Sequence, residues 1–177
     1  LLVDDVEFRK ITPEEAFSQI RNGTAEGTAA TGFASQAGGR MTVTSDDWYE
    51  GTHSWLIEPE IDYDAFIQDH ISVEAGKTYR FSGWAKLKEG TKGMLRVDYR
   101  NMGGAGDRDY RIDIVNTQWR RFDFYLKAPI TTDDLWLFFW LDNSTNDFML
   151  DNISFAECEA LPGVPTVSID GGLFKDE

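Results

Sequence analysis

Hydrophobic and polar residues alternate along most of the chain after residue 40. In residues 79–86, for example, Tyr79 and Phe81 alternate with Arg80 and Ser82. This period of two is typical of a β-strand with one buried and one outward face. Glycine-rich turn signals separate the short runs. The pattern predicts strands at residues 41–45, 53–58, 65–73, 78–88, 93–100, 108–115, 119–127, 134–142 and 148–156.

This succession of short strands predicts an all-β fold, an antiparallel β-sandwich of the jelly-roll type. One segment differs from the alternating pattern. Thr12 is a suitable N-cap, Pro13 suits the first helical position and Glu15 the third. We therefore expect one short N-terminal helix at residues 13–21.

The run at residues 134–142 is apolar on both faces. Leucines and Phe139 occupy one face, while Trp136, Phe138 and Trp140 occupy the other. Such a strand is either covered on both sides, for example by a helix at residues 13–21, or presents its aromatic rings to a ligand. The sequence leaves both interpretations open.

Outward positions of several predicted strands combine aromatic rings with charged side chains, and they could share one concave sheet. Aromatic rings stack on the apolar face of a pyranose, and Arg and Asp bond its hydroxyls. The candidate ligand-binding residues are Trp84, Trp136, Trp140, Tyr125, Arg80, Arg96, Asp98, Arg100, Arg111 and Arg121.

Composition sharpens this hypothesis. The 177 residues are 41% hydrophobic, enough for one domain with a sizeable core. A net charge of −14 disfavours nucleic acid and membrane surfaces as partners. Arginines gathered on outward positions of so acidic a chain would suit an anionic, uronate-containing polysaccharide such as alginate or pectin. Alternatively, Arg and Asp pair across strands, for example Arg96 with Asp113 or Asp123.

Few features indicate catalysis or a disulfide. Cys158 is the single cysteine, and His53 and His70 are the only histidines, at no metal-binding spacing. No Gly-x-Ser-x-Gly or phosphate-loop motif occurs. We expect a non-catalytic module. A jelly-roll polysaccharide lyase or glycosidase is the less favoured alternative, since Asp and Glu are numerous.

Two short motifs enclose the β region. Residues 22–27, Asn-Gly-Thr-Ala-Glu-Gly, and residues 148–155, Phe-Met-Leu-Asp-Asn-Ile-Ser-Phe, resemble the opening and closing signatures of jelly-roll carbohydrate-binding modules, the galactose-binding-like domains grouped as families four, nine and twenty-two. Ala25 stands where the signature has Phe. The resemblance implies that the first and last strands lie side by side, that Glu26 and Asp151 help to hold a structural calcium ion, and that a sheet face binds glycan chains.

The same comparison divides the chain into three parts. Residues 22–156 form the module, and residues 157–177 form a linker and a possible start of a downstream module. Residues 1–21 hold the helix and an N-terminal strand, whose residues 1–8 repeat the pattern of 148–155. Those eight residues end an upstream module or add an edge strand to this one.

This organisation favours polysaccharide binding within a larger secreted carbohydrate-active enzyme, with neighbouring modules as partners. The alternative is a structural or adhesive spacer of an extracellular protein. No run of 18 apolar residues occurs, and a chain beginning at Leu1 is typical of a piece of a longer protein.

Overall fold

The computed structural model describes residues 19–20, 23–26, 34–35, 38–61, 65–90, 93–101, 108–114, 117–142 and 146–158. These residues form ten strands and no helix. The strands are β1 (Ala34–Ser35), β2 (Arg40–Thr44), β3 (Ser54–Glu58), β4 (Ala65–Val73), β5 (Thr78–Leu87), β6 (Gly93–Arg100), β7 (Arg108–Ile114), β8 (Arg120–Lys127), β9 (Thr132–Asp142) and β10 (Phe148–Cys158).

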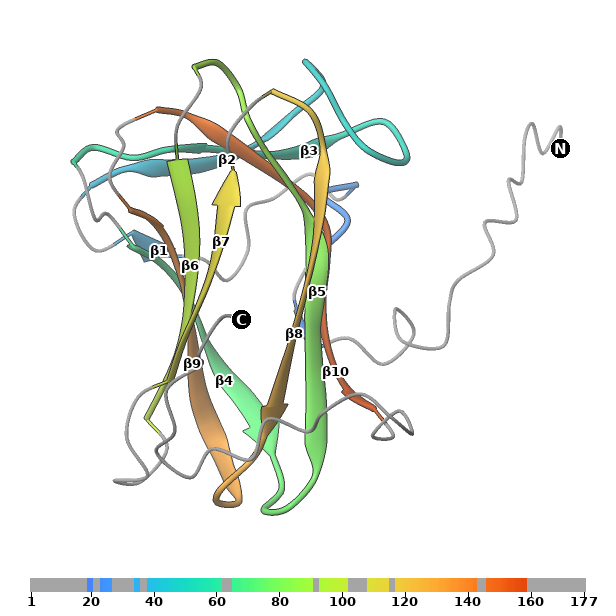
Figure 1. The fold of residues 1–177 in the computed structure, drawn as a ribbon, viewed down its shortest axis with the longest axis vertical. Helices are drawn as coiled ribbons and strands as arrows, with labels where there is room; N and C mark the ends of the chain where they lie inside the picture. Colours follow the sequence, from blue (N-terminus) through green and yellow to red (C-terminus); the bar gives the residue numbers. More distant parts are fainter. Residues whose placement is uncertain are drawn as a thin grey trace, which may run out of the picture.

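The strands build two antiparallel five-stranded sheets (Figure 1). Sheet A has the order β1-β4-β9-β6-β7, and sheet B has the order β2-β3-β10-β5-β8. The predicted all-β antiparallel sandwich is therefore confirmed. All nine predicted strands are present, with ends within two residues of the predicted ones.

Two differences from the sequence analysis concern the N-terminal part. The two-residue strand β1, which pairs with β4, was not predicted because two residues carry no measurable period. The predicted helix at residues 13–21 lies outside the described residues, except for residues 19–20, which are not helical. The proposed division of the chain stays a prediction.

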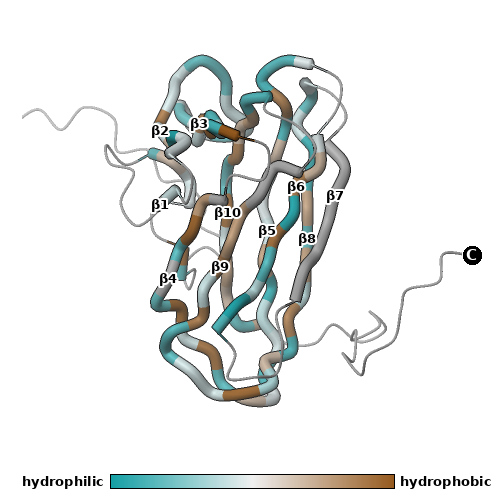
Figure 2. Tube along the Cα trace, turned by 90° about the vertical axis from the view of Figure 1, so that its left-hand side faces the viewer, coloured by the Kyte–Doolittle hydropathy of each residue, from teal (hydrophilic) through white to brown (hydrophobic). Residues whose placement is uncertain are grey.

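The core lies between the sheets and is made by the alternating apolar residues. Figure 2 shows hydrophobic and hydrophilic stretches following one another within single strands. Phe81 of β5 contacts Phe122 in its own sheet and Phe139 of the facing sheet, with ring centroids 5.2 and 5.3 Å apart. Full burial of one such side chain stabilises a fold by about 1.5–3 kcal/mol. Packing of facing aromatics thus holds the two sheets together.

Strand β10 lies in the middle of sheet B and changes register between Asp151 and Ser154. Its first half pairs with β3 as well as β5, and its second half continues along β5. Ile153, within the irregularity, donates its N–H to the carbonyl of Gly23 at 3.0 Å. A Cβ at residue 23 would lie 1.9 Å from the Ile153 carbonyl oxygen, so this close approach requires glycine. The opening motif therefore lies beside the last strand. The first and last strands themselves are not neighbours, because β1 belongs to sheet A and β10 to sheet B.

Gln19 connects the two sheets at one edge of the sandwich. Its backbone N–H donates to the Phe155 carbonyl of β10 at 2.8 Å. Its side-chain amide exchanges two 2.8 Å hydrogen bonds with the backbone of Ser72 in β4. Gln19 thus satisfies backbone groups of β4 that would otherwise present an unpaired strand edge.

Candidate functional site

The outer face of sheet A carries an aromatic column on β9 beside a charged column on β6. The strand register sets three rows, in which Trp140 lies opposite Arg96, Phe138 opposite Asp98, and Trp136 opposite Arg100. Because β6 and β9 are hydrogen-bonded neighbours, opposite residues are about 4.5–5.5 Å apart at their Cβ atoms. Register alone therefore brings aromatic and guanidinium groups together here.

A buried carboxylate organises the charged column. Asp98 is 5% exposed. Its Oδ2 accepts a hydrogen bond from Arg100 Nη2 at 3.0 Å, and its Oδ1 lies 3.4 Å from Arg96 Nε. The Arg100 guanidinium also lies 4.5 Å above the ring centre of Phe138. Two guanidinium groups thus lie on either side of one carboxylate, in an order set by the strand.

Trp136 is the exposed ring of the aromatic column. It is 39% exposed, whereas Phe138 beside it is 1% exposed. Their ring centres lie 6.3 Å apart with the planes tilted by 32°. Trp136 Nε1 donates a 3.0 Å hydrogen bond to Oδ1 of Asp134, the outward residue two positions earlier. On the outward face of β9, Phe138 is therefore covered and Trp136 is open to a ligand, so neither of the two interpretations holds for the whole strand.

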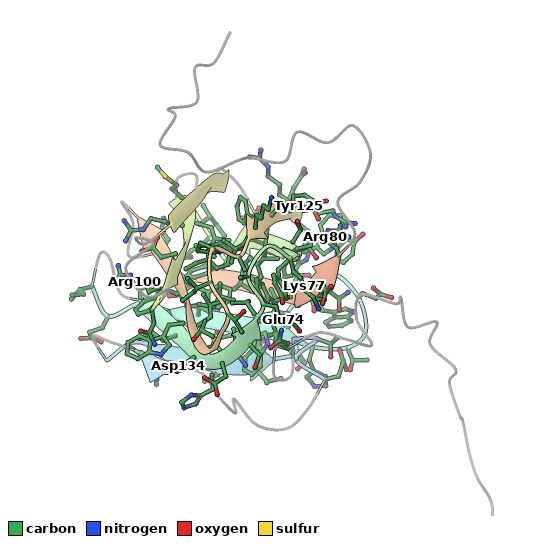
Figure 3. The ribbon with its side chains drawn as sticks, turned by 90° about the horizontal axis from the view of Figure 1, so that it is seen from below. Glu74, Lys77, Arg80, Arg100, Tyr125 and Asp134 are labelled. Carbon is green, nitrogen blue, oxygen red and sulfur yellow. The ribbon has the colours of Figure 1, made fainter. Side chains whose placement is uncertain are left out.

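The prediction that all ten candidate residues share one face is wrong. Trp84 and Arg80 belong to β5, and Tyr125 and Arg121 belong to β8, both in sheet B. Figure 3 shows Arg100 on one side of the sandwich, and Arg80 and Tyr125 on the other. Alternation identifies the outward residues of a strand, but it does not identify the sheet that the strand joins.

Trp84 also differs from Trp136 in its surroundings. The ring of Tyr49, from the loop at residues 45–53, stacks on Trp84 with centroids 3.6 Å apart and planes 16° apart. Trp119 meets Tyr49 edge to face, with centroids 6.5 Å apart. Tyr49 therefore covers one face of Trp84, which is the surface that a sugar ring would need.

An ion pair fixes the start of the same loop. Lys86, 7% exposed, pairs with the carboxylate of Asp47, which also accepts a 3.3 Å hydrogen bond from Trp119 Nε1. Burial by itself raises the pKa of Asp47, but the hydrogen bonds from Lys86 and Trp119 outweigh it and leave the pKa lowered. Asp47 thus stays ionised and anchors the loop on sheet B.

The remaining arginines of sheet B pair within that sheet. Asp123 Oδ1 accepts from Arg80 Nε at 2.6 Å, and Asp123 Oδ2 accepts from Arg121 Nε at 2.8 Å. The alternative that Asp123 pairs with Arg96 is therefore wrong, because Arg96 lies in the other sheet.

The sequence analysis also offered a pairing of Arg96 with Asp113, a residue of β7. The register sets Arg96 opposite Arg111, and Met94 opposite Asp113. Arg96 and Asp113 are thus diagonal rather than directly opposite neighbours, and their pairing stays a prediction because the side chain of Asp113 lies outside the described residues. The side chains of Arg111 and Trp140 lie outside the described residues, and only their positions in the register are known.

The predicted metal ligands organise the rest of the loop. Glu26 Oε1 accepts backbone hydrogen bonds from Thr52 at 2.8 Å and His53 at 3.0 Å. Burial by itself raises the pKa of Glu26. The hydrogen bonds from Thr52 and His53 together lower it by more, so the pKa is lowered overall. Gly51 has φ of 85°, and a Cβ there would lie 2.3 Å from Glu26 Oε1. Only glycine fits under this carboxylate.

Asp151 is fully buried at the bend of β10. Its Oδ2 accepts backbone hydrogen bonds from Tyr49 at 2.8 Å and Glu50 at 3.1 Å, and its Oδ1 accepts one from Asn152 at 2.7 Å. Burial raises the pKa of Asp151 to about 6 despite these donors, and the negative charge of Glu26 raises it further. Removal of the Asp151 carboxylate from water is thus the main cause, and the nearby charge of Glu26 adds to it.

The oxygen atoms around Glu26 and Asp151 are of the types that calcium binds. The buried Oδ1 of Asn152 has no hydrogen-bond partner, while its Nδ2 donates to Glu50 at 2.8 Å. Calcium takes six to eight oxygen ligands, including carboxylate, amide and backbone carbonyl oxygens. Among the described residues, no three His, Cys, Asp or Glu side chains gather around one point. Glu26 and Asp151 would therefore need amide or carbonyl oxygens to complete the site.

A cavity of about 1100 Å³ lies at the end of the sandwich formed by the turn between β4 and β5. Figure 3 shows Glu74 and Lys77 at this end. Lys77 pairs there with Glu74 at 3.1 Å and Glu157 at 3.0 Å. The aromatic residue among its described lining, Tyr79, is only 4% exposed. Despite its size, the cavity offers no stacking surface, and we favour the face of sheet A as the functional site.

Sequence reasoning missed Asp134 and Tyr49. Asp134 precedes Trp136 by two positions, and period-two alternation places both on one face, so this signal was available. No local signal connects Tyr49 with Trp84, because their contact depends on how a loop packs on a distant strand.

In the described part of the chain, no helix has the length and hydrophobicity needed to cross a membrane.

Comparisons with known proteins agree with this geometry. Residues 18–145 match the family model described as "Carbohydrate binding domain". No curated protein sequence matches the chain. Three solved structures share the fold at low identity, and each is almost entirely covered by the chain.

The first is the xylan-binding family 22 module of Paenibacillus barcinonensis Xyn10C, with a TM-score of 0.66, 14% identity, 78% of this chain and 93% of that chain covered. The second is a xylan-binding domain of family 22, with a TM-score of 0.63, 18% identity, 81% and 96% covered. The third is the C-terminal family 22 module of Clostridium thermocellum Xyn10B, with a TM-score of 0.60, 18% identity, 76% and 91% covered.

Proposed function

The chain belongs to the carbohydrate-binding domain family, whose modules bind carbohydrate without catalysis, and we propose that it binds a polysaccharide chain along the outer face of sheet A. One observation carries the assignment of the face: exposed Trp136 lies opposite Arg100 of the neighbouring strand, on the outward face that also carries Asp98 and Arg96. The ring supplies a stacking plane, and the guanidinium groups supply directional donors around it.

We assign the ligand class as a glycan that carries uronates. Arg96 and Arg100 both contact the carboxylate of Asp98, and guanidinium groups match carboxylates in geometry, which supports an anionic group in the ligand. Two of the compared structures are described as xylan-binding, and this supports a xylose backbone. A xylan decorated with glucuronate combines the apolar ring faces that suit Trp136 with carboxylates that suit the arginines.

Affinity electrophoresis tests this proposal. Gels containing unsubstituted xylan, glucuronoxylan, polygalacturonate or alginate should retard the protein, glucuronoxylan most strongly. Retardation in glucuronoxylan should weaken with added salt, because charge attraction contributes to binding. Equal retardation by all four gels, or none in any, would contradict the proposed ligand class. Shortening of the glucuronoxylan chains would contradict the assignment as a non-catalytic module.

The variants Arg96→Ala and Arg80→Ala form a matched pair that tests which sheet face binds the polysaccharide. Each removes a guanidinium group that contacts an outward-facing aspartate, the first on sheet A and the second on sheet B. We expect Arg96→Ala to reduce the retardation and Arg80→Ala to leave it unchanged. The reverse result would move the binding face to sheet B.

We also propose a structural calcium ion held by Glu26 and Asp151. The raised pKa of Asp151 and the unpaired Asn152 Oδ1 support it, since a cation would neutralise the first and bond the second. This ion would stabilise the loop at residues 45–53. It would take no part in sugar contact, because that loop packs on sheet B.

Finally, we propose that the chain is one module of a larger secreted carbohydrate-active enzyme. The repeat of the 148–155 pattern in residues 1–8 supports neighbouring modules of the same polypeptide. If residues 1–8 end another module, a chain lacking them should keep its melting temperature. A large fall would make them a strand of this domain.

A further inference from the structure

Backbone strain marks two places in the described part of the chain. The non-glycine residues with positive φ are Ala25, His70, Asn101 and Asn152, at 58°, 57°, 62° and 47°. Ala25 and Asn152 are adjacent in sequence to the two proposed calcium ligands. His70 and Asn101 come from different strands, yet both contact the side chain of Asp134. Such conformations are held only where the surrounding structure over-determines them, and they concentrate at functional sites.

Three strands converge on the carboxylate of Asp134. Asn101, directly after β6, donates its side-chain amide to both the carbonyl oxygen and Oδ2 of Asp134, each at 2.8 Å. His70, at the irregularity of β4, places Nδ1 3.1 Å from Asp134 Oδ1. Thr132 adds a hydroxyl acceptor, 3.1 Å from the backbone nitrogen of Asp134. This carboxylate is therefore fixed although its side chain is 39% exposed.

The fixed carboxylate in turn bonds the exposed indole. Trp136 Nε1 donates to Asp134 Oδ1 at 3.0 Å, and Trp136 is 39% exposed. A half-exposed side chain normally samples several rotamers, and immobilising such a side chain on binding costs conformational entropy. The bond to Asp134 removes that cost in advance. It also occupies the indole N–H, so the indole ring offers its faces to a ligand.

We propose that Asp134, held by Asn101 and His70, is a positioning residue that fixes Trp136 as a preorganised stacking plane for the apolar face of a sugar ring. This inference rests on the proposed polysaccharide function and deepens it. It assigns Trp136 contact with ring C–H groups, because its only hydrogen-bond donor is already used. The uronate-binding charges lie on the neighbouring column at Arg96 and Arg100.

The free protein gives the first test, by the indole N–H signal of Trp136 in nitrogen-15 NMR, assigned through its absence in Trp136→Phe. In Asp134→Ala this signal should shift and exchange with water faster. Asp134→Asn should restore protection, because an amide oxygen can still accept the bond. Asp123→Ala, the matched change on sheet B, should leave the signal in place. An unshifted signal in Asp134→Ala overturns the inference without any ligand.

Binding to glucuronoxylan gives the second test, as a double-mutant cycle with melting curves confirming that each variant is folded. Asp134→Ala should weaken binding about 3- to 10-fold, the size expected for one side chain that must be ordered on binding. In the Trp136→Phe background, which lacks the indole N–H, it should add less than about 2-fold. Asp134→Asn should bind nearly as the unchanged protein does.

The two possible failures are distinguishable. An equal loss from Asp134→Ala in both backgrounds would show that Asp134 acts independently of Trp136, and would overturn the inference while the binding face stands. No binding of the unchanged protein to glucuronoxylan, xylan, polygalacturonate or alginate would overturn the proposed function, and this inference with it.

Discussion

The outer faces of the two sheets carry the same charge arrangement and differ in what lies over their aromatic rings. On sheet A, Asp98 contacts Arg96 and Arg100. On sheet B, Asp123 contacts the two arginines Arg80 and Arg121. Each of these two clusters thus combines two guanidinium groups with one carboxylate, and a tryptophan lies on the same face. Charge alone does not distinguish a binding face from a structural one.

The difference comes from the loop at residues 45–53. This loop packs Tyr49 on Trp84 and is anchored by Asp47, Glu26 and Asp151. On sheet A, by contrast, Trp136 keeps 39% of its surface exposed. An aromatic residue on an outward face is therefore informative only together with the segments that cover it.

The largest expected effect tests this contrast directly. Trp84→Ala removes a partly buried ring stacked on Tyr49, so we expect a loss of about 2–3 kcal/mol in the free energy of unfolding, somewhat less than for a fully buried aromatic. Trp136→Ala should cost less than about 1 kcal/mol of stability, since its ring is exposed. Urea denaturation measures both values.

Glucuronoxylan affinity completes the comparison of the two tryptophans. Trp136→Ala should weaken binding about 10- to 100-fold through lost stacking, whereas folded Trp84→Ala should bind normally. Stability losses in the opposite order would show that Trp136 is a core residue and Trp84 the exposed plane.

An intermediate effect concerns the loop that separates the two faces. The pKa of Asp151 is raised to about 6 in the folded protein, above its ordinary value of 3.8, so the folded state binds more protons between these values. Without calcium, the contribution of Asp151 to stability is fully present below pH 3.8 and decreases as the pH rises through 6. The decrease should be on the order of 2 kcal/mol.

Chemical denaturation in a chelator, at several pH values, measures this change, with Asp151→Asn as the control that cannot titrate. Added calcium should raise stability at pH 7 in the unchanged protein and remove the decrease. Identical curves with calcium and with chelator would contradict the proposed ion. Sugar binding at pH 7 should change little, because Asp151 belongs to the structural face.

The smallest effect concerns the charges. Arg100→Ala should weaken binding to glucuronoxylan about 10-fold, or about 1.4 kcal/mol, and reduce the dependence of binding on salt. Arg121→Ala, which also removes a donor to an outward aspartate, should change neither quantity. Binding isotherms at low and high salt make the measurement. Equal effects of the two variants would mean that the net charge of the protein, rather than one face, governs binding.

Much of this architecture was predictable from local pattern. Period-two alternation located nine of the ten strands, because burial of one face imposes that period wherever a strand is long enough to show it. It also identified the outward residues of β6 and β9. The opening and closing motifs lie beside each other at Gly23 and Ile153, although the strands β1 and β10 belong to different sheets.

What the sequence determined by itself was therefore which residues point outward from each strand and what chemistry they offer. Only the tertiary structure decided which strands share a sheet, because strand pairing depends on long-range contacts that leave no trace in a local period. The same reason explains Trp84 and Trp136: both are outward by pattern, but packing of Tyr49 covers the first, and the bond to Asp134 fixes the second in an exposed position.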